Sequence, residues 1–150
     1  MRKRTHKGPV NASKVRYDGI LFASKLEVYC YKRLKEEGLF NKYEEEKFTI
    51  IDGTTCTLEC YERTANGKGD LIERGRGKKI LGISYKPDFT GDDYIIECKG
   101  RANDTFPIRW KLFKLHQIKT GDNRPLYKPQ NQKEVDVIID IIKQKRDGQK

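Results

Sequence analysis

Apolar residues recur at helical spacing in three parts of the chain. The first part follows Ser24 and Glu27, which stand at the spacing of a capping box, and it predicts a helix over about residues 24–37. The second part starts where Pro107 fits the first turn of a helix, and it predicts a helix that ends near residue 119. The third part follows Asn131, a favourable helix cap, and predicts a final helix.

Between the first two helices, apolar and polar positions alternate, which predicts strands rather than helices. A short hairpin over residues 15–22 is expected around Asp18-Gly19, and Asp52-Gly53 has the sequence of a second hairpin turn. Residues 63–79 contain four glycines and many charges, which predicts a long mobile loop. The remaining predicted strands are 43–51, 54–61, 80–89 and 94–99, with a last one at 126–128.

The order of the main elements is α-β-β-β-β-α-β-α, which indicates a mixed α/β fold. A length of 150 residues suits one domain with a single modest core. We therefore expect a basic flexible arm at 1–16, a single domain at 17–142 and a basic tail at 143–150.

The charge of the chain points to a polyanion as its partner, but it does not locate a functional site. There are 32 Lys and Arg against 22 Asp and Glu, which gives a net charge of +10. Residues 1–16 supply +6 of this excess, and residues 143–150 supply a further +3. Such an excess is typical of proteins that bind nucleic acid. Because most of it lies at the two ends, the central region is nearly neutral.

The composition also excludes several classes of protein. No apolar run is long enough to span a membrane, and the basic start of the chain lacks the apolar stretch of a secretory signal. The four cysteines do not form a dense framework, so a cytoplasmic protein is expected. The Gly-Lys-Gly and Gly-Arg-Gly-Lys segments lack the Ser or Thr of a P-loop, so no nucleoside triphosphate is expected as a partner.

The most informative chemistry lies around the predicted turn at residues 91–93. Glu97 and Lys99 alternate with Cys98 in the following strand, so Glu97 and Lys99 share one face. The turn can bring Asp88 beside Glu97. Two carboxylates and a backbone carbonyl suit a hard divalent cation such as Mg²⁺, and a nearby ammonium can orient water or bind a charged phosphoryl group. The alternative is an ordinary solvated strand, which the apolar neighbours of Glu97 disfavour.

These residues carry a resemblance to a known group of enzymes. Pro87-Asp88 followed by Glu97-Cys98-Lys99 resembles the Pro-Asp…(Asp/Glu)-x-Lys signature of the restriction-endonuclease-like nuclease superfamily. The segment from Phe22 to Glu27, followed by Tyr43 to Glu46, is similar to the phage endonuclease I branch, whose members resolve branched DNA. Related phage proteins without an assigned function resemble the sequence equally well. The segment before Pro87 is longer than this branch would lead us to expect, because of residues 63–79.

The resemblance implies a restriction-endonuclease-like mixed β-sheet core flanked by helices and a metal-dependent endodeoxyribonuclease activity. Asp88, Glu97 and the backbone carbonyl of Cys98 would bind Mg²⁺, with Mn²⁺ as a substitute, and Lys99 would orient water or phosphate. Glu27 would be an accessory metal ligand. Its position three residues after Ser24 also fits a helix cap, and the two roles compete for one carboxylate.

Two basic surfaces are candidates for DNA contact. One follows the motif and runs into the second predicted helix, where Trp110, Phe113 and Ile118 are expected to pack inward; the other lies in the glycine-rich segment. The candidate DNA-binding residues are Arg101, Arg109, Lys111 and Lys114 in the first group, and Arg74, Arg76, Lys78 and Lys79 in the second. Solvated helix and loop surfaces are the ordinary alternatives.

The sequence therefore predicts a Mg²⁺-dependent deoxyribonuclease. By resemblance, its substrate would be branched DNA, and a homodimer would be needed to cut paired strands; if the protein is phage-encoded, it would act in the host cytoplasm. Two alternatives remain open at this stage. One is a DNA-binding protein of the same fold without catalysis, and the other is a structural partner in a phage replication or packaging complex.

Overall fold

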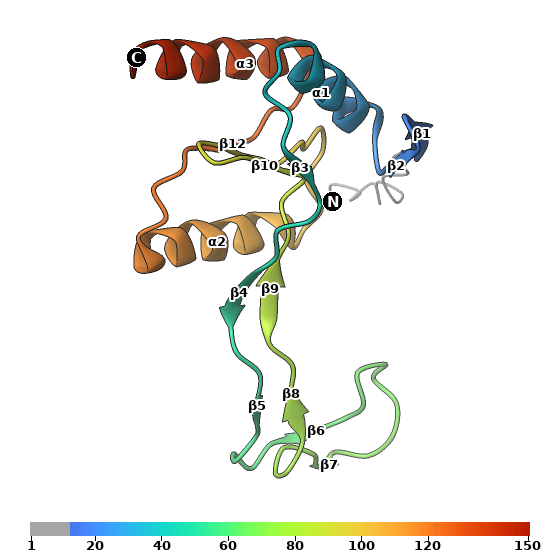
Figure 1. Ribbon diagram of the computed structural model, residues 1–150. Helices are drawn as coiled ribbons and strands as arrows, with labels where there is room; N and C mark the ends of the chain where they lie inside the picture. Colours follow the sequence, from blue (N-terminus) through green and yellow to red (C-terminus); the bar gives the residue numbers. More distant parts are fainter. Residues whose placement is uncertain (1–12) are drawn as a thin grey trace, which may run out of the picture. The chain divides into compact units, whose positions relative to one another are not determined.

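The computed structural model describes residues 13–150, and this part of the chain divides into two compact units (Figure 1). Unit 1 contains the chain up to Glu46 and the segment Lys86–Lys150, and unit 2 is Lys47–Tyr85. The single domain expected at 17–142 includes residues of both units. Unit 2 is compact in itself because every strand of residues 47–85 pairs with another strand of the same segment.

Unit 1 is built on a mixed four-stranded sheet. Strand β11 pairs with β12 in parallel, whereas β10 pairs with β11 and with β3 antiparallel. A parallel neighbour needs a crossover connection, and helix α2 (Phe106–Thr120) supplies it between β11 and β12. The strands, in sheet order, are β12 (Leu126–Tyr127), β11 (Ile95–Ile96), β10 (Phe89–Thr90) and β3 (Lys42–Tyr43). This arrangement confirms the mixed α/β class.

The helices of unit 1 form where their caps predict. Helix α1 (Lys25–Glu36) begins after Ser24, whose hydroxyl accepts a hydrogen bond of 3.2 Å from the Glu27 N–H. Helix α3 (Gln132–Asp147) begins after Asn131, whose side-chain oxygen accepts a hydrogen bond of 2.9 Å from the Glu134 N–H. Helix α3 continues through Asp147, so the first residues of the basic tail expected at 143–150 are helical.

The hydrophobic core of unit 1 lies between the sheet and the pair of helices α1 and α3, which Figure 1 shows on one side of the sheet, with α2 on the other. Phe22, Leu34, Phe89, Ile96 and Ile139 are fully buried in this core. The four apolar positions that repeat along α3 are all buried, as their helical spacing predicts: Val135, Ile138, Ile139 and Ile142.

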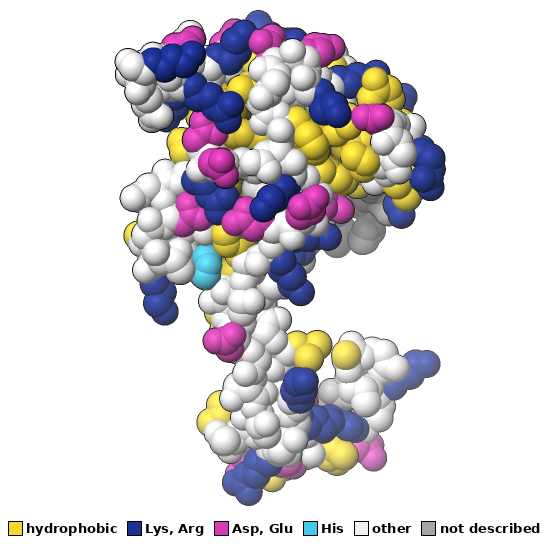
Figure 2. Space-filling model, viewed as in Figure 1, with side chains coloured by type: hydrophobic (Ala, Val, Ile, Leu, Met, Phe, Trp, Pro, Cys, Tyr) yellow, Lys and Arg dark blue, Asp and Glu magenta, His cyan; other side chains and the backbone are white. Residues whose placement is uncertain are grey.

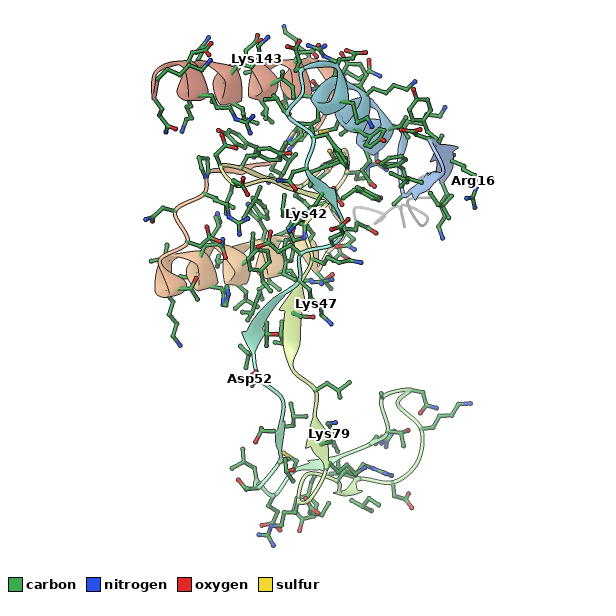
Figure 3. All side chains as sticks on the ribbon, in the orientation of Figure 1. Arg16, Lys42, Lys47, Asp52, Lys79 and Lys143 are labelled. Atoms are coloured by element: carbon green, nitrogen blue, oxygen red, sulfur yellow. The ribbon has the colours of Figure 1, made fainter. Side chains whose placement is uncertain are left out.

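The hairpin predicted before α1 is also present. Strands β1 (Val15–Tyr17) and β2 (Ile20–Phe22) pair antiparallel, and the turn residues Asp18 and Gly19 both have positive φ, at 51° and 75°. Asp-Gly is favoured where both central residues of a hairpin turn need positive φ. Arg16, labelled in Figure 3, belongs to β1, so the predicted arm at 1–16 overlaps a strand at its end. Residues 1–12 of that arm lie outside the described residues.

Unit 2 is a series of two-stranded antiparallel pairs. The predicted hairpin turn at Asp52-Gly53 is wrong, because the chain continues through these residues to pair further along with a later segment (Figure 3). A Cβ atom on Gly53 would lie 2.8 Å from the Ile80 carbonyl oxygen, so the glycine allows two backbones to approach closely. The pairs are β4 (Phe48–Ile51) with β9 (Ile83–Tyr85), β5 (Thr54–Thr55) with β8 (Lys79–Ile80), and β6 (Tyr61–Glu62) with β7 (Ile72–Glu73).

Unit 2 keeps many apolar side chains in solvent, as the yellow atoms along it in Figure 2 show. Leu58 and Leu81 are 68% and 74% exposed, whereas Tyr85 is the large apolar side chain that is buried in residues 47–85. The predicted loop at 63–79 contains β7 and the first residue of β8. Backbone pairing, rather than a hydrophobic core, therefore organises this unit.

An ion-pair network joins three separate segments of unit 1 through Arg124. Its guanidinium lies 2.8 Å from Glu46 Oε1 and 2.7 Å from Asp122 Oδ2, and it donates a further bond of 3.1 Å to the Gly91 carbonyl. The bond from Arg124 lowers the pKa of Asp122 to about 2, and it also lowers the pKa of Glu46. Arg124 thus holds the turn between β10 and β11 against the chain that precedes unit 2.

Replacing Arg124 with Met should destabilise the protein, because Glu46 and Asp122 would lose their shared cation. We expect a loss of about 1–3 kcal/mol in the free energy of unfolding at pH 7, measured by urea denaturation. The pKa values of both acids are depressed in the folded state, so the stabilisation is present above about pH 4 and is lost as the pH falls toward 2. An equal loss for the Met protein at pH 7 and at pH 2.5 would contradict this assignment.

Candidate active site

The candidate site is formed by the hairpin of β10 and β11. Phe89 pairs with Ile96 and Thr90 with Ile95, and the turn is closed by a 3.0 Å bond from the Gly91 N–H to the Tyr94 carbonyl. Continuing this register by one residue places Asp88 opposite Glu97. Because opposite residues in an antiparallel pair share a face, their two carboxylates lie on the same side of the hairpin.

Both carboxylates are buried, which is inconsistent with an ordinary solvated strand. Asp88 is 9% exposed and Glu97 is 7% exposed. Asp88 Oδ2 accepts a 2.7 Å hydrogen bond from the Cys98 N–H. Burial raises the pKa of Asp88 well above its usual value, and the charges of Glu97 and Glu27 raise it further. The site therefore concentrates negative charge in a poorly solvated place.

Lys99 follows on the same face and adds the positive charge. Its ammonium lies 3.7 Å from Glu97 Oε1, and its side chain is 28% exposed. The same ammonium lies 4.6 Å from the centroid of the Phe106 ring, at the start of α2. Lys99 is thus held between a carboxylate and an aromatic face, with part of its side chain open to solvent.

Glu27 comes to the site from α1, and its carboxylate makes several hydrogen bonds. Glu27 Oε2 accepts bonds from the Ala23 N–H at 3.1 Å and from the Tyr43 hydroxyl at 2.7 Å, and the Ser24 hydroxyl donates to Oε1 at 3.0 Å. The helix-cap role is therefore present in the structure. Glu27 is only 5% exposed, and its charge raises the pKa of Asp88, so it also belongs to the electrostatics of the site.

The donor atoms suit a hard divalent cation, although they are not gathered into a preformed cage. Asp88, Glu97 and the Cys98 carbonyl offer oxygen ligands, and the repulsion between buried carboxylates would be relieved by a cation. Within residues 13–150, no group of three His, Cys, Asp or Glu side chains is arranged to hold a metal ion. The Cys98 thiol is not a suitable ligand, because a hydrogen bond with Cys30 and burial raise its pKa well above the usual value.

The predicted DNA-binding residues fall into both units. Arg101, Arg109, Lys111 and Lys114 are exposed in unit 1, and the other four, Arg74, Arg76, Lys78 and Lys79, belong to unit 2. In unit 2, Arg76 pairs with Glu59 at 3.2 Å. The expected packing of α2 is correct for Trp110 and Phe113, which are buried, but wrong for Ile118, which is 78% exposed.

Tyr43 stands in the segment that carries the resemblance, but its contact with the site, like those of Phe106 and Lys128, was not predicted from the sequence. Tyr43 binds the Glu27 carboxylate, Phe106 lies under Lys99, and Lys128 also approaches the Phe106 ring. Tyr43 follows the Phe22–Glu27 segment by many residues, and only the pairing of β3 with β10 brings it close. The spacing of these three residues along the chain does not predict the contacts, because the contacts depend on the order of strands in the sheet.

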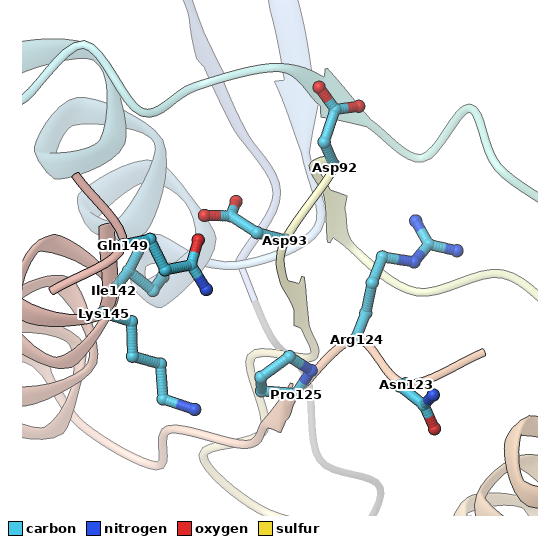
Figure 4. Close-up of a pocket in the computed structure, with 8 residues that line it drawn as sticks. All are labelled: Asp92, Asp93, Asn123, Arg124, Pro125, Ile142, Lys145 and Gln149. Atoms are coloured by element: carbon cyan, nitrogen blue, oxygen red, sulfur yellow. The ribbon is translucent and has the colours of Figure 1, made fainter. Parts of the chain in front are cut away.

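A cavity lies at the opposite end of the same hairpin, next to the turn, and Figure 4 shows the side chains that line it. Its volume is about 460 Å³, and Asp93, Arg124 and Lys145 are among its lining residues. Arg146 neutralises Asp93 through two bonds of 2.7 Å, and Arg124 is already bound by Glu46 and Asp122. None of the sequence-predicted site residues lines this cavity.

The fold and the site define a mixed α/β protein with buried carboxylates and a lysine on one β-hairpin. The chain belongs to the family described as "Protein of unknown function (DUF1064)", which matches residues 7–131. No curated protein and no solved structure matches the chain. Within residues 13–150, each helix is too short or too polar to cross a membrane.

Replacing Asp88 with Asn should stabilise the protein in buffer that contains EDTA. The raised pKa means that the folded protein holds this proton to a higher pH than the unfolded chain, so the ionised carboxylate lowers stability as the pH rises above about 4. Asn can still accept the bond from the Cys98 N–H but carries no charge. We expect Tm to rise by several degrees at pH 7.5 and the difference to disappear near pH 4, as followed by differential scanning fluorimetry.

The exposed Asp140 on α3 provides the matched control for this measurement. An Asp140→Asn protein should keep the Tm of the wild type at pH 7.5. A lower Tm for Asp88→Asn at this pH would show that the charge at position 88 is compensated in the folded protein, and the electrostatic account of the site would be wrong.

Proposed function

We propose that the protein is a Mg²⁺-dependent DNA endonuclease with a restriction-endonuclease-like fold. The observation that carries the proposal is the burial of Asp88 and Glu97 side by side on one hairpin, with Lys99 on the same face. A structural strand gains nothing from two adjacent buried carboxylates, since each raises the cost of ionising the other. A site that binds a divalent cation and a phosphodiester explains both the acids and the lysine.

Asp88, Glu97 and the Cys98 carbonyl would hold the metal ion, with Glu27 as an accessory ligand. When bound, Mg²⁺ supplies Lewis-acid stabilisation of the negative charge that develops on the phosphoryl group. The ammonium of Lys99, fixed by Glu97 and Phe106, would orient the attacking water or bind a non-bridging oxygen. In-line attack by this water would break the phosphodiester bond.

The exposed basic residues of α2 and of the preceding segment would contact the phosphates on either side of the cleaved bond. Arg101 and Arg109 lie on either side of Phe106 in the sequence, and Lys111 and Lys114 follow within the same helix. Phosphate contacts of this kind fix the register of the substrate without reading its sequence. The resemblance to junction-resolving enzymes extends the proposal to branched DNA, to a homodimer and to a cytoplasmic site of action.

Purified protein should cleave supercoiled plasmid or a four-way junction in Mg²⁺ or Mn²⁺, and EDTA should abolish the cleavage. Asp88→Asn and Lys99→Met should each lower the cleavage rate at least about 100-fold, because each removes a group that acts in the transition state. Lys133→Met, which removes an exposed charge from α3, is the control and should cut like the wild type.

Metal binding can be measured without cleavage. Ca²⁺ or Mg²⁺ should raise the Tm of the wild type, and the rise should grow with the logarithm of the metal concentration above Kd. The Tm of Asp88→Asn should not change with either metal. Cleavage that persists in a folded Asp88→Asn protein would overturn the site assignment. Binding of DNA by the wild type without any cleavage would instead support a non-catalytic DNA-binding protein. Equal rates on linear duplex and on junctions would remove the junction specificity alone.

The two roles of Glu27 can be separated by substitution. Gln at this position can still complete a capping box, so Glu27→Gln should keep the Tm near that of the wild type but should lower cleavage at least about tenfold through loss of the negative charge. Ser24→Ala should do the opposite: it should cost about 1 kcal/mol of stability and leave the cleavage rate unchanged. Unimpaired cleavage by Glu27→Gln would reduce Glu27 to a helix cap.

A further inference from the structure

Asp88, Glu97 and Lys128 form a row of charged residues, each one position outside one of three adjacent strands: β10, β11 and β12. Ile96 pairs with Tyr127 in the parallel pairing of β11 and β12, and the ladder continues with a 2.9 Å bond from the Glu97 N–H to the Tyr127 carbonyl. The next bond, also 2.9 Å, runs from the Lys99 N–H to the Pro129 carbonyl. Continuing the register by one residue places Lys128 beside Glu97, on the side of Glu97 that faces away from Asp88.

A shared aromatic ring brings Lys128 and Lys99 together. The Lys99 ammonium lies 4.6 Å from the centroid of Phe106, and the Lys128 ammonium lies 5.8 Å from the same centroid. Phe106 is 5% exposed and stacks with Trp110 at a centroid distance of 5.9 Å, so the ring is a fixed platform. Two ammonium groups at one ring repel each other, and an anion bound between them would be stabilised by both.

The two lysines differ in how far they are already neutralised. Lys99 pairs with Glu97, whereas Lys128 is exposed and has no carboxylate within ion-pair distance among the described residues. Lys128 therefore retains its full charge for a ligand. Since its neighbours across the sheet are the two buried acids, its position fits a group that holds the phosphate while the acids hold a cation.

We propose that Lys128 is a second phosphate-binding cation of the site, and that it contacts a non-bridging oxygen of the phosphodiester that is cleaved. This inference rests on the proposed nuclease function. Lys99 and Lys128 would then bind the same phosphoryl group from the two segments that follow β11 and β12, with Phe106 setting their spacing. Lys128 was part of a predicted strand, but its sequence position gives no link to Lys99.

Binding in EDTA tests the contact independently of cleavage. Lys128→Met keeps an unbranched side chain that can pack on Phe106 but removes the charge. We expect it to bind a short DNA duplex about 3- to 10-fold more weakly, and the slope of log K against log salt should fall by about one, because one phosphate contact is lost. Lys128→Arg should restore both values. Lys133→Met, which removes one exposed charge from α3, is the matched control and should leave the slope unchanged.

Single-turnover cleavage in Mg²⁺ tests whether the phosphate that Lys128 contacts is the reacting one. Lys128→Met should lower the rate constant about 10- to 100-fold at saturating enzyme, and Lys128→Arg should recover most of it. Lys128→Met could lower the slope of log K against log salt by one and yet keep the rate constant of the wild type. Lys128 would then contact a flanking phosphate, and its assignment to the phosphate that is cleaved would be wrong. An unchanged slope and an unchanged rate constant would overturn the whole inference.

The same two measurements separate this inference from the proposed function. In one outcome, the wild type binds DNA without cleaving it, and Lys128→Met, unlike Lys133→Met, lowers the slope of log K against log salt by about one. The phosphate contact is then supported, and the nuclease proposal fails. If the wild type cleaves and Lys128→Met behaves like Lys133→Met in both assays, the nuclease proposal stands and the role of Lys128 fails. A wild type that does not bind DNA overturns both.

Discussion

The pairing of Phe89 with Ile96 is the constraint on which the candidate site depends. These two residues are fully buried on the side of the sheet that packs against α1 and α3, so the register cannot slip without exposing them. Strand alternation then sends Asp88 and Glu97 to the other side and leaves them directly opposite each other. The packing of the core therefore holds the two carboxylates close together, although their charges repel each other.

This arrangement lowers the stability of the protein in the absence of a ligand. Asp88 keeps one compensating contact, the 2.7 Å bond from the Cys98 N–H, but burial and two neighbouring carboxylates raise its pKa. Elsewhere in unit 1, acids that serve only structure are matched by arginines, as Asp93 is by Arg146 and Asp122 by Arg124. Asp88 has no such arginine among the described residues, and this contrast separates the candidate site from the rest of the unit.

Elements whose signals are local could be predicted from the sequence. Ser24 and Asn131 cap the helices that they were expected to cap, and Asp18-Gly19 makes the expected hairpin turn. The approach of Asp88 to Glu97 follows from a short turn and was also predictable. The prediction of a hairpin turn at Asp52-Gly53 was wrong. A glycine that allows two backbones to approach closely cannot be told from a turn glycine by sequence alone.

The parts of the site that depend on strand order were beyond prediction. Tyr43 belongs to one edge strand of the four-stranded sheet, β3, and Lys128 directly follows the other, β12. Nothing in their spacing along the chain tells which strands will flank the hairpin. Ile118 shows the same limit for helices, since helical spacing defines a face but does not say whether anything covers it. The motif therefore identifies the centre of the candidate site, and the order of strands in the sheet decides which further groups surround it.

Glu27 connects the stability of the fold to the electrostatics of the site. Its carboxylate accepts the Ala23 N–H, and Ala23 directly follows β2, so the bond joins the first hairpin to the first turn of α1. The Tyr43 hydroxyl, from β3, binds the same oxygen. Three elements thus fix one carboxylate whose charge acts on Asp88. A side chain so restrained loses little conformational entropy on binding a cation, so the bonds from Ala23 and Tyr43 would prepare Glu27 for ligation.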